Sequence, residues 1–335
     1  MSYRDAGVDL EGADRHTGRI APTVTATWGP DVVGSFGAFA AGVRIPSGYR
    51  DPVLMLTTDG VGTKLELARS TGRWDGVGAD LVAMCVDDLA ASGARPLAFV
   101  DYMAVGALDP DRDAAIVASI ADACSEAACA LVGGETAEHP GVMDPGQVDL
   151  AGTALGVVEH GSEVTGSEIS EGDVVLGVAS PNLRSNGFSL VRAVFADADL
   201  DAAFPGGRRT LGDVLLEPSI LYSPAVLGLP MRPHGLAHIT GGGLAGNLAR
   251  IVPRGLGARI HRGTWRVPRI FDEIAQRGDI DRAEMERTFN MGVGFCVVVA
   301  AHEADEASRH LEREGHEVAA IGEIVSSDRP VDIED

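Results

Sequence analysis

The stretch Thr57-Thr58-Asp59-Gly60-Val61-Gly62-Thr63-Lys64 follows directly on the apolar run Val53-Leu54-Met55-Leu56. A buried strand that opens into a loop with a carboxylate, two glycines, hydroxyls and a lysine resembles a site for phosphate and a divalent metal. Glycine lets backbone N–H groups approach an anion, lysine adds a point charge, and aspartate binds Mg²⁺. The alternative is that Asp59-Gly60 is only a turn after a strand. The spacing is not that of a Walker A loop, which needs Gly-x4-Gly-Lys-Ser/Thr.

The length and composition of the chain limit the classes of protein to consider. Its 335 residues exceed one typical core and fit two domains of ordinary size. An apolar fraction of 45% with 43 glycines indicates a compact α/β or α+β protein with many tight loops. The net charge of -22 argues against a nucleic-acid partner, which needs a basic surface. A phosphorylated ligand must then be bound by glycine loops, helix N-termini, metal and single basic residues.

The cysteines and the apolar runs indicate the cellular compartment. The chain has four cysteines, Cys85, Cys124, Cys129 and Cys296, without C-x-x-C spacing or the density of a secreted disulfide scaffold. We expect them to be buried thiols in a reducing environment. No apolar run approaches the roughly 18 to 20 residues of a membrane span, and the N-terminus lacks the apolar core of a signal peptide. We therefore expect a cytoplasmic protein that does not bind membranes.

More acidic residues occur near the ends of predicted elements. The run Ala130-Leu131-Val132 predicts a short strand that enters the loop Gly133-Gly134-Glu135-Thr136-Ala137-Glu138. Residues 77–89 have helical spacing and contain Asp87 and Asp88. Adjacent helix residues point about 100° apart, so one aspartate can face a cleft while the other faces solvent. Two exposed surface aspartates are the alternative. Acids at strand ends lie where ligand sites of α/β proteins collect.

The remaining polar loops lie at the start of the chain and after a linker predicted at residues 159–162. Residues 1–45 show little periodicity and predict an arm or a functional loop, and Gly34-Ser35-Phe36-Gly37 favours the loop. The second half contains three such segments, Arg184-Ser185-Asn186-Gly187, His238-Ile239-Thr240-Gly241-Gly242-Gly243 and Thr288-Phe289-Asn290-Met291-Gly292. This division is typical of an enzyme that binds Mg-nucleotide on one domain and another polar substrate across a cleft.

Seven short motifs in order give the chain a resemblance to a known family. They are Tyr-x-x-Ala-Gly-Val-Asp at 3–9, Thr-Asp-Gly-Val-Gly-Thr-Lys at 58–64, Asp-Leu-Val-Ala-Met-Cys-Val at 80–86, Gly-Gly-Glu-Thr-Ala-Glu at 133–138, Ser-Asn-Gly at 185–187, His-Ile-Thr-Gly-Gly-Gly at 238–243 and Phe-Asn-Met-Gly-Val-Gly at 289–294. On these motifs the chain resembles the aminoimidazole ribonucleotide synthetases, the phosphoribosylformylglycinamidine cyclo-ligases of purine biosynthesis. The match runs from Tyr3 to about Ile324.

The resemblance implies a fold, an assembly and a reaction. The fold is α+β, or α/β-like, with two domains that each contain a mixed sheet and helices. Residues 1–160 would bind ATP and metal, and residues 161–335 would form the second domain. The resemblance further implies a homodimer whose sheets form a central β-barrel. ATP with Mg²⁺ would phosphorylate the amide oxygen of formylglycinamidine ribonucleotide, and ring closure would release phosphate.

The resemblance also implies roles for individual residues. The expected metal ligands are Asp59, Asp88 and Glu135. The groups expected to take part in catalysis are Asp59, Asp88, Arg184 and His238. The residues expected to bind the nucleotide are Gly60, Gly62, Thr63, Lys64, Gly133, Gly134 and Thr136. Those expected to bind the ribonucleotide are Gly34, Ser35, Phe36, Gly37, Ser185, Asn186, Thr240, Gly241, Gly242 and Asn290.

The chain departs from the family pattern at several positions. Ala21 stands where a lysine is common after Arg-Ile, and Arg19 is a candidate to replace its charge. Arg184 replaces a histidine before Ser-Asn-Gly, and can hold a phosphate but cannot act as a base near neutral pH. Asp87 replaces an asparagine. A Pro-Thr-Arg-Ile-Tyr segment is matched only partly at residues 218–222. His139, where methionine is commoner, is either a further imidazole for the site or incidental.

Two other functions compete with the cyclo-ligase. The first is a superfamily relative that phosphorylates another small molecule, as the similar selenophosphate synthetase, thiamine-monophosphate kinase and hydrogenase-maturation proteins do. The chain lacks the N-terminal cysteine nucleophile and the C-terminal cysteine tail found among them. The second is a nucleotide-binding dimer that has kept the scaffold and lost catalysis, a possibility that Ala21 and Arg184 keep open.

Overall fold

The computed structural model describes residues 10–335, so the motif at residues 3–9 lies outside the described part of the chain. Contacts divide the chain into two compact units. Unit 1 contains the described residues up to Leu89, with Arg95–His160 and Asp199–Leu221, and unit 2 contains Ala90–Ala94, Gly161–Ala198 and Tyr222–Asp335. The units are not the two continuous halves 1–160 and 161–335, because residues 199–221 return to unit 1.

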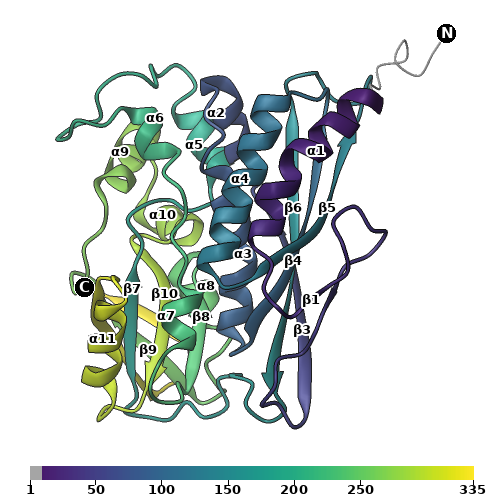
Figure 1. Ribbon diagram of the computed structural model, residues 1–335. Helices are drawn as coiled ribbons and strands as arrows, with labels where there is room; N and C mark the ends of the chain where they lie inside the picture. The colour runs from purple at the N-terminus through teal and green to yellow at the C-terminus, as the bar shows by residue number, and fades with distance from the viewer. Residues whose placement is uncertain (1–9) are drawn as a thin grey trace. The chain divides into compact units, whose positions relative to one another are not determined.

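Unit 1 is built on a four-stranded mixed sheet (Figure 1). Its strands, in spatial order, are β3 (Pro52–Gly60), β6 (Val148–Glu159), β4 (Arg95–Val105) and β5 (Ala130–Glu138). Strand β6 is antiparallel to β3 and β4, whereas β4 and β5 are parallel and are joined by helix α4 (Pro110–Glu126). A parallel pair requires such a crossover. Two short strands, β1 (Val32–Val33) and β2 (Gly42–Val43), form a separate ribbon.

The strands that carry the predicted loops run further than the sequence indicated. Strand β3 continues through Asp59, which pairs with Gly152 of β6, and ends at Gly60. Strand β5 continues through Glu135 to Glu138, paired with β4. The prediction that these acids stand in loops after the strands is therefore wrong. Backbone pairing with the long β6 and β4 keeps these polar residues in the sheet.

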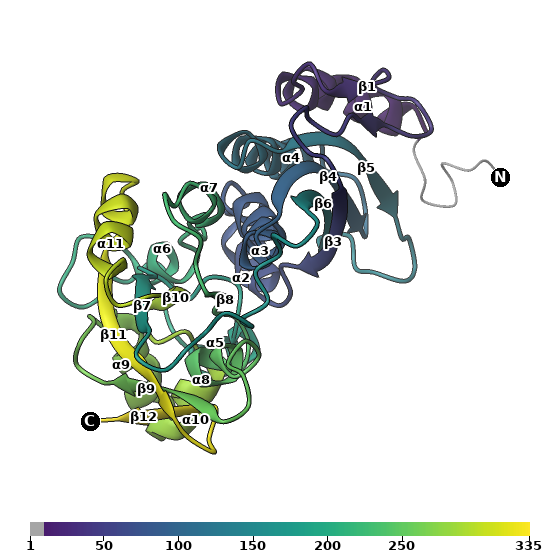
Figure 2. The same ribbon diagram turned by 90° about the horizontal axis from the view of Figure 1, so that it is seen from below.

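Helices α3 (Val77–Ala91) and α4 cover one face of this sheet, as Figure 2 shows. Phe99 and Leu81 meet there below Gly152, where an added Cβ would lie 2.3 Å from Phe99 Cζ. Helix α4 begins after Asp109, which caps it by accepting hydrogen bonds from two backbone N–H groups of its first turn. Helix α1 (Leu10–Ala26), which packs on α4 and β5, is a helix where the sequence predicted an arm or a loop.

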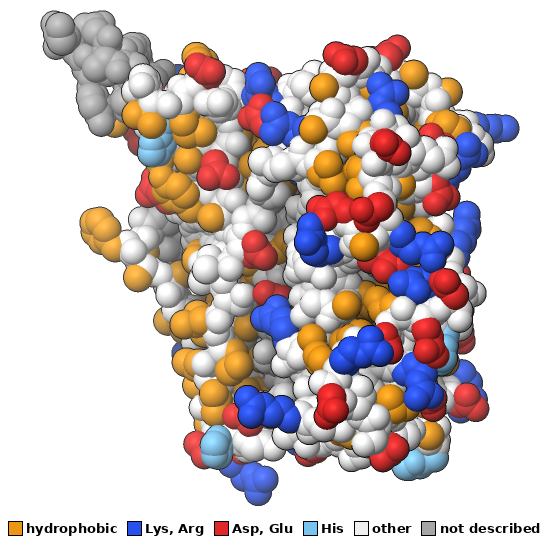
Figure 3. All heavy atoms as spheres, turned by 180° about the vertical axis from the view of Figure 1, so that it is seen from behind, with side chains coloured by type: hydrophobic (Ala, Val, Ile, Leu, Met, Phe, Trp, Pro, Cys, Tyr) orange, Lys and Arg blue, Asp and Glu red, His pale blue; other side chains and the backbone are white. Residues whose placement is uncertain are grey.

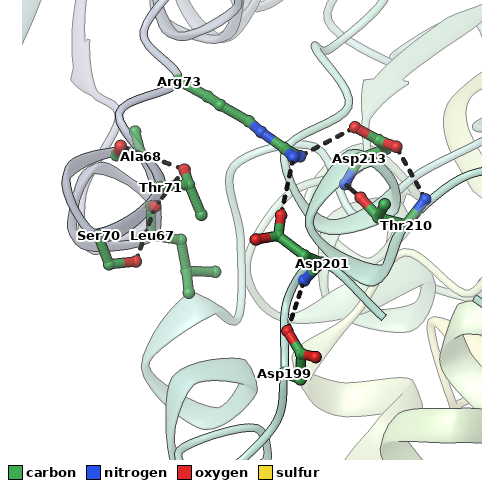
Figure 4. A network of polar contacts seen from close by, with 9 residues as sticks. All are labelled: Leu67, Ala68, Ser70, Thr71, Arg73, Asp199, Asp201, Thr210 and Asp213. Carbon is green, nitrogen blue, oxygen red and sulfur yellow. Dashed lines mark hydrogen bonds and ion pairs between the residues drawn. The ribbon is translucent and has the colours of Figure 1, made fainter. Parts of the chain in front are cut away.

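Charged side chains connect the segment Asp199–Leu221 to the rest of unit 1 (Figure 4). Arg73 follows helix α2 (Lys64–Thr71), and its guanidinium lies 2.9 Å from Asp213 Oδ1 and 3.4 Å from Asp201 Oδ1. Asp213 also forms a capping box with Thr210 at the start of helix α6 (Leu211–Leu215). The hydrogen bonds from Thr210 hold the pKa of Asp213 below its usual value, so the carboxylate is charged when it meets Arg73.

Unit 2 contains a six-stranded sheet with helices around it. The strands, in spatial order, are β12 (Val331–Glu334), β9 (Leu256–His261), β11 (Val318–Ser326), β7 (Val174–Ala179), β10 (Val293–Val299) and β8 (Gly235–His238). Neighbours are antiparallel except β12 and β9. The helices are α5 (Phe188–Val194), α7 (Ser223–Leu227), α8 (Gly243–Leu248), α9 (Arg269–Gly278), α10 (Arg282–Thr288) and α11 (Ala304–Arg313).

The interior of each unit is apolar, as the composition of the chain predicts. In unit 2, Val175, Ile260, Cys296 and Ile321 belong to one buried apolar cluster. All four cysteines are buried and reduced, as expected for small apolar side chains. Among the described helices, none combines the length and the apolar character needed to cross a membrane. Mixed sheets with helices in both units confirm the predicted fold class.

Candidate functional site

Two of the predicted metal ligands, Asp59 on β3 and Asp88 on α3, lie near the C-terminal part of β3. Asp59 is exposed there, and its Oδ1 accepts a hydrogen bond from the N–H of Gly60 at 2.7 Å. Asp88 on α3 reaches the same strand, since Thr57 Oγ1 lies 3.5 Å from its Oδ2. Burial raises the pKa of the Cys85 thiol, and the charges of Asp59 and Asp88 raise it further. The two carboxylates therefore both lie close enough to one buried thiol to act on it electrostatically.

Of the aspartate pair on α3, Asp87 is fully buried and Asp88 is half-buried. The alternative of two exposed surface aspartates is therefore wrong. The expectation that one of them faces solvent also fails for Asp87, which lies in the interior. Its charge contributes to raising the pKa of Glu126 on α4, after the burial of Glu126 itself.

The turn after β3 leads directly into α2. Gly62 adopts φ +69°, a left-handed conformation that glycine reaches without strain, and Thr63 precedes the helix. Gly62 and Thr63 are exposed and precede the N-terminus of α2. Such a position is favourable for an anion.

Lys64, the first residue of α2, lies in the interior. Its Nζ is 2.6 Å from Asp80 Oδ2 and donates a hydrogen bond to the carbonyl oxygen of Glu217 at 2.9 Å. Asp80 Oδ1 in turn accepts from both the N–H and the hydroxyl of Ser219. The ammonium is thus directed into unit 1 and held by Asp80 and Glu217, and its expected contact with phosphate stays a prediction. The partly matched segment at residues 218–222 contributes Ser219 to this network.

The glycines of β5 lie against a carboxylate that the sequence analysis did not single out. An added Cβ on Gly134 would lie 2.2 Å from Asp101 Oδ1, so only glycine fits beside Asp101 on β4. Burial raises the pKa of Asp101 to about 7, and the neighbouring charge of Glu135 raises it too. The available signal was an aspartate inside an otherwise apolar strand, residues 97–102.

A cavity of about 590 Å³ in unit 1 brings two predicted groups of residues together. Its lining contains Gly133, Gly134, Glu135 and Thr136 of β5 and the loop residues Ser35, Phe36 and Gly37. The first group was expected to bind nucleotide or metal, and the second to bind the ribonucleotide. Helix α1 contributes His16 to the same cavity, which the sequence analysis did not consider. His16 had no motif around it and could be found only from its position in the fold.

Arg19, the candidate to replace the missing lysine charge, and His139 both have partners in unit 1. Arg19 Nη1 lies 2.8 Å from Asp111 Oδ1 in an exposed ion pair, and Ala21 follows it on α1. His139 Nε2 lies 3.0 Å from the hydroxyl of Tyr102. Tyr102 is on β4 beside Glu135 of β5, so His139 is close to the predicted metal ligand.

In unit 2 the structure brings Arg184 and His238 together. Arg184 is fully buried, with φ +58°, and its Nη2 lies 3.0 Å from His238 Nε2. The guanidinium carbon is 4.8 Å from the centre of the Tyr222 ring, which is a cation–π contact. His238 stacks on Phe295, with ring centroids 6.1 Å apart. A guanidinium only donates hydrogen bonds, so Nε2 of His238 accepts this one.

The other predicted substrate residues surround that pair. Asn186 and the His238 loop are neighbours, because an added Cβ on Gly241 would lie 3.6 Å from Asn186 Oδ1. Asn247 holds the loop in place by donating from Nδ2 to the carbonyl oxygens of Thr240, Gly241 and Gly243. Gly241 and Gly242 are exposed, whereas Thr240, Ser185 and Asn186 are half-buried.

Asn290 is buried and holds the backbone of its own turn. Its Nδ2 donates to the carbonyl oxygen of Asn182 at 3.0 Å, and its Oδ1 accepts from the N–H of Gly292 at 2.8 Å. Asn182 Oδ1 accepts from the N–H of Arg184 at 2.9 Å. Asn290 therefore supports the segment that carries Arg184, Ser185 and Asn186.

The donors present are suited to magnesium but do not form a closed cage. Asp59, Asp88 and Glu135 offer carboxylate oxygens, the ligand type that Mg²⁺ prefers. Within residues 10–335, no group of three or more His, Cys, Asp or Glu side chains is placed to hold a metal ion. Mg²⁺ in nucleotide sites is bound through one or two carboxylates, phosphate and water, so this donor set fits a metal that arrives with its nucleotide.

Solved structures share the fold at low sequence identity. The thiamine-monophosphate kinase of Stenotrophomonas maltophilia K279a matches with a TM-score of 0.70 and 20% identity, over 98% of this chain and 97% of that one. The hydrogenase maturation protein HypE in complex with ATP matches with a TM-score of 0.68 and 18% identity, over 98% and 93%. At these identities the likeness establishes the fold and nothing more.

Sequence comparison is more specific. Residues 39–158 match the model for the N-terminal domain of AIR synthase related proteins, and residues 170–333 match the model for their C-terminal domain. Phosphoribosylformylglycinamidine cyclo-ligases are 46% identical in Synechococcus sp. (strain CC9605), over 98% of this chain and 96% of the relative, and 48% identical in Aromatoleum aromaticum, over 97% and 95%. The chain therefore belongs to the AIR synthase related proteins, as a member of the phosphoribosylformylglycinamidine cyclo-ligase family.

Proposed function

We propose that this protein catalyses the ATP-dependent cyclisation of formylglycinamidine ribonucleotide to 5-aminoimidazole ribonucleotide in purine biosynthesis, with release of ADP and phosphate. The observation that carries the proposal is identity of 44% to 48% with cyclo-ligases over at least 97% of the chain. The solved kinase and HypE are only 20% and 18% identical. Another phosphorylated substrate, or a scaffold without catalysis, is therefore not favoured.

The reaction has two steps, a phosphoryl transfer and a ring closure. An amide oxygen is a poor leaving group, so the γ-phosphoryl group of ATP is first transferred to it. The amidine nitrogen of the same molecule then attacks the activated carbon, the carbon–oxygen bond breaks, and the oxygen leaves with phosphate. The protein contributes chiefly by positioning these groups and by neutralising phosphate charge.

In unit 1 we assign the nucleotide and its metal to residues of β3, α2, α3 and β5. Asp59, Asp88 and Glu135 would hold Mg²⁺, which would neutralise phosphate charge when bound. Gly60, Gly62 and Thr63 would present backbone N–H groups to phosphate at the N-terminus of α2. Gly133, Gly134 and Thr136 would contact the nucleotide from β5. Lys64 would act indirectly, by fixing the start of α2 through its buried pair with Asp80 at 2.6 Å.

In unit 2 we assign the ribonucleotide to the loops around His238. Ser185, Asn186, Thr240, Gly241 and Gly242 would contact it, and Asn290 would hold the Ser185 segment in place. Arg184 would orient the imidazole of His238 through the hydrogen bond to Nε2. The nitrogen Nδ1 of His238 would then carry the ring proton and act as a donor toward the substrate.

We further propose a homodimer in the cytoplasm, without nucleic-acid or membrane partners. The open face of the unit 1 sheet supports the dimer, because Leu54, Leu56, Val100 and Tyr102 are between 41% and 71% exposed on it. Hydrophobic side chains also gather along the left side of the view in Figure 3. A second copy that pairs its own sheet with this face would bury these side chains in a barrel.

One assay tests the proposed activity. Purified protein is mixed with ATP, Mg²⁺ and formylglycinamidine ribonucleotide, and the aminoimidazole product is measured with ADP and phosphate. We expect one ADP and one phosphate for each aminoimidazole formed. Binding of ATP without formation of the aminoimidazole product would contradict the proposed cyclo-ligase activity.

A further inference from the structure

Lys64 is the only lysine of the chain, whereas lysine and arginine together number 27, so arginine fills every other position of this kind. The side chain of Lys64 is 1% exposed, and its Nζ lies 2.6 Å from Asp80 Oδ2 and 2.9 Å from the carbonyl oxygen of Glu217. Lysine carries a compact ammonium, whereas arginine carries a larger planar guanidinium. A site this enclosed therefore selects lysine in a chain that otherwise uses arginine.

Three consecutive residues bring a distant part of the chain to this site. The carbonyl oxygen of Glu217 accepts the hydrogen bond from the ammonium. Pro218 packs on Gly76, where an added Cβ would lie 2.6 Å from Pro218 Cγ. Ser219 donates to Asp80 Oδ1 twice, from its N–H over 2.9 Å and from its hydroxyl over 2.6 Å. All these residues belong to unit 1, although Ser219 and Asp80 are 139 positions apart in the sequence.

Asp80 depends on the hydroxyl of Ser219 because the carboxylate is fully buried. Burying a carboxylate is costly unless both of its oxygens have charged or hydrogen-bonding partners. Lys64 lies against Oδ2, and the two donors of Ser219 satisfy Oδ1. Loss of the hydroxyl would remove the shorter of these two bonds and would loosen the carboxylate that holds the ammonium.

Lys64 in turn fixes the start of α2, since it is the first residue of that helix. Gly62, at φ +69°, and Thr63 lead into it. The side chain of Thr63 makes no capping hydrogen bond to the first turn of the helix. The beginning of α2 is therefore held by the buried ammonium in place of a side-chain cap, and the turn before it takes its position from Lys64.

We propose that Ser219 is a positioning residue for the turn at Gly62 and Thr63 and acts on it through Asp80 and Lys64. The inference rests on the proposed function for the assignment of phosphate to this turn. Ser219 orients the carboxylate of Asp80, the carboxylate holds the ammonium, and the ammonium fixes the start of α2. Backbone N–H groups bind and align a phosphate best when the protein holds their direction in advance, so this chain of contacts contributes to phosphate binding without touching the ligand.

The test compares Ser219→Ala, Ser219→Thr and the control Ser70→Ala in the full chain. Ser70 lies near the other end of α2, where its hydroxyl donates to the carbonyl oxygen of Leu67. Calorimetry well below the thermal midpoint gives dissociation constants for Mg-ATP, Mg-tripolyphosphate and adenosine. We expect Ser219→Ala to weaken Mg-ATP and Mg-tripolyphosphate by roughly three- to tenfold, the effect of about one hydrogen bond, and to leave adenosine unchanged. Ser219→Thr keeps the hydroxyl and should recover the affinity, and Ser70→Ala should match the wild type.

Lys64→Arg tests whether the site requires an ammonium. The variant keeps the positive charge, but a guanidinium does not fit the same contacts with Asp80 and Glu217. We expect it to weaken Mg-ATP at least as much as Ser219→Ala does. Wild-type affinity in a folded Lys64→Arg protein would overturn the chain of contacts at its second member.

Hydrogen exchange of the backbone amides of residues 60–66, measured by mass spectrometry without ligand, reports on the turn directly. We expect exchange there to be at least threefold faster in Ser219→Ala, with the amides of α4 unchanged. A merely structural Ser219 would lower the thermal midpoint and change neither this exchange nor the affinities. Unchanged exchange or unchanged tripolyphosphate affinity would overturn the proposal, as would equal weakening of adenosine. The exchange result stands even if the wild type forms no aminoimidazole, which would count against the proposed activity alone.

Discussion

Arg184 donates a hydrogen bond from Nη2 to Nε2 of His238 over 3.0 Å, and both side chains are buried. Because the guanidinium keeps its protons at all physiological pH values, Nε2 of His238 must be the acceptor and the ring proton lies on Nδ1. The arginine that replaces the family's histidine before Ser185 therefore acts on a second predicted catalytic residue. Arg184, a departure from the family pattern, and His238, from a separate motif, are therefore hydrogen-bonded partners in the structure.

Arg184→Leu should impair catalysis more than ATP binding. The change leaves Nε2 of His238 buried without its donor and removes the guanidinium from the Tyr222 ring, 4.8 Å away. We expect kcat to fall at least tenfold and the free energy of unfolding to fall by about 1 to 3 kcal/mol. Steady-state kinetics and urea unfolding measure both, with the exposed Arg192→Leu on α5 as control. Wild-type kcat in Arg184→Leu would show that His238 does not depend on this contact.

Lys64→Met should destabilise unit 1. The ammonium lies 2.6 Å from Asp80 Oδ2 in the interior, and removing one member of a buried pair typically costs about 3 to 5 kcal/mol. Chemical denaturation measures the loss. The matched control is Arg209→Met, whose partly exposed pair with Glu217 should contribute about 0 to 1 kcal/mol. If Lys64→Met keeps its stability and loses ATP affinity, Lys64 is a phosphate ligand after all.

Asp59→Asn should abolish Mg-ATP turnover without unfolding the protein. Asp59 is exposed at the end of β3, so the amide fits the same space while a neutral oxygen binds Mg²⁺ poorly. Turnover is compared with that of Asp75→Asn, another exposed aspartate of unit 1. Thermal midpoints of both variants should match the wild type. Near-normal turnover in Asp59→Asn would place the metal elsewhere.

Asp101 should make the stability of the protein depend on pH. Burial raises its folded pKa from 3.8 to about 7, so between these values the folded state binds a proton that the unfolded state has lost. Stability from this group is therefore complete below about pH 4 and declines by a few kcal/mol as the pH rises to about 7. Asp101→Asn cannot ionise, so its urea-unfolding free energy should vary less over this range. Asp122→Asn, exposed on α4, should keep the wild-type slope.

Parts of this architecture were predictable because the sequence carries local physical signals. The apolar runs at residues 53–56 and 130–132 predicted β3 and β5, and the helical spacing of residues 77–89 predicted α3. Helix α1 was missed because its described residues bury only His16 and Val24, which leaves little apolar periodicity to detect. The ends of β3 and β5 were missed because their polar residues and glycines do not show a strand pattern in the sequence. These residues extend the strands only through backbone pairing with the neighbouring strands.

The candidate site, too, could be predicted only in part from the sequence. Motifs identified Asp59, Glu135 and His238 because their neighbours in sequence are distinctive. Lys64 belongs to such a motif, yet its partner Asp80 is 16 positions away and the carbonyl of Glu217 is 153 positions away. Burial of this kind depends on tertiary packing. His16 has no motif at all and is notable only for the cavity it lines.

The open face of the unit 1 sheet gives a final prediction, on assembly. Leu56 is 71% exposed in the middle of β3, beside Leu54 on the same face. If a second copy covers this face, Leu56→Asp places a charge in the interface and should convert a dimer into monomers. Sedimentation velocity measures the mass, and Glu171→Gln, exposed in unit 2, is the control. A Leu56→Asp variant that stays dimeric would place the interface elsewhere, and a wild type that is monomeric at micromolar concentration would contradict the proposed dimer.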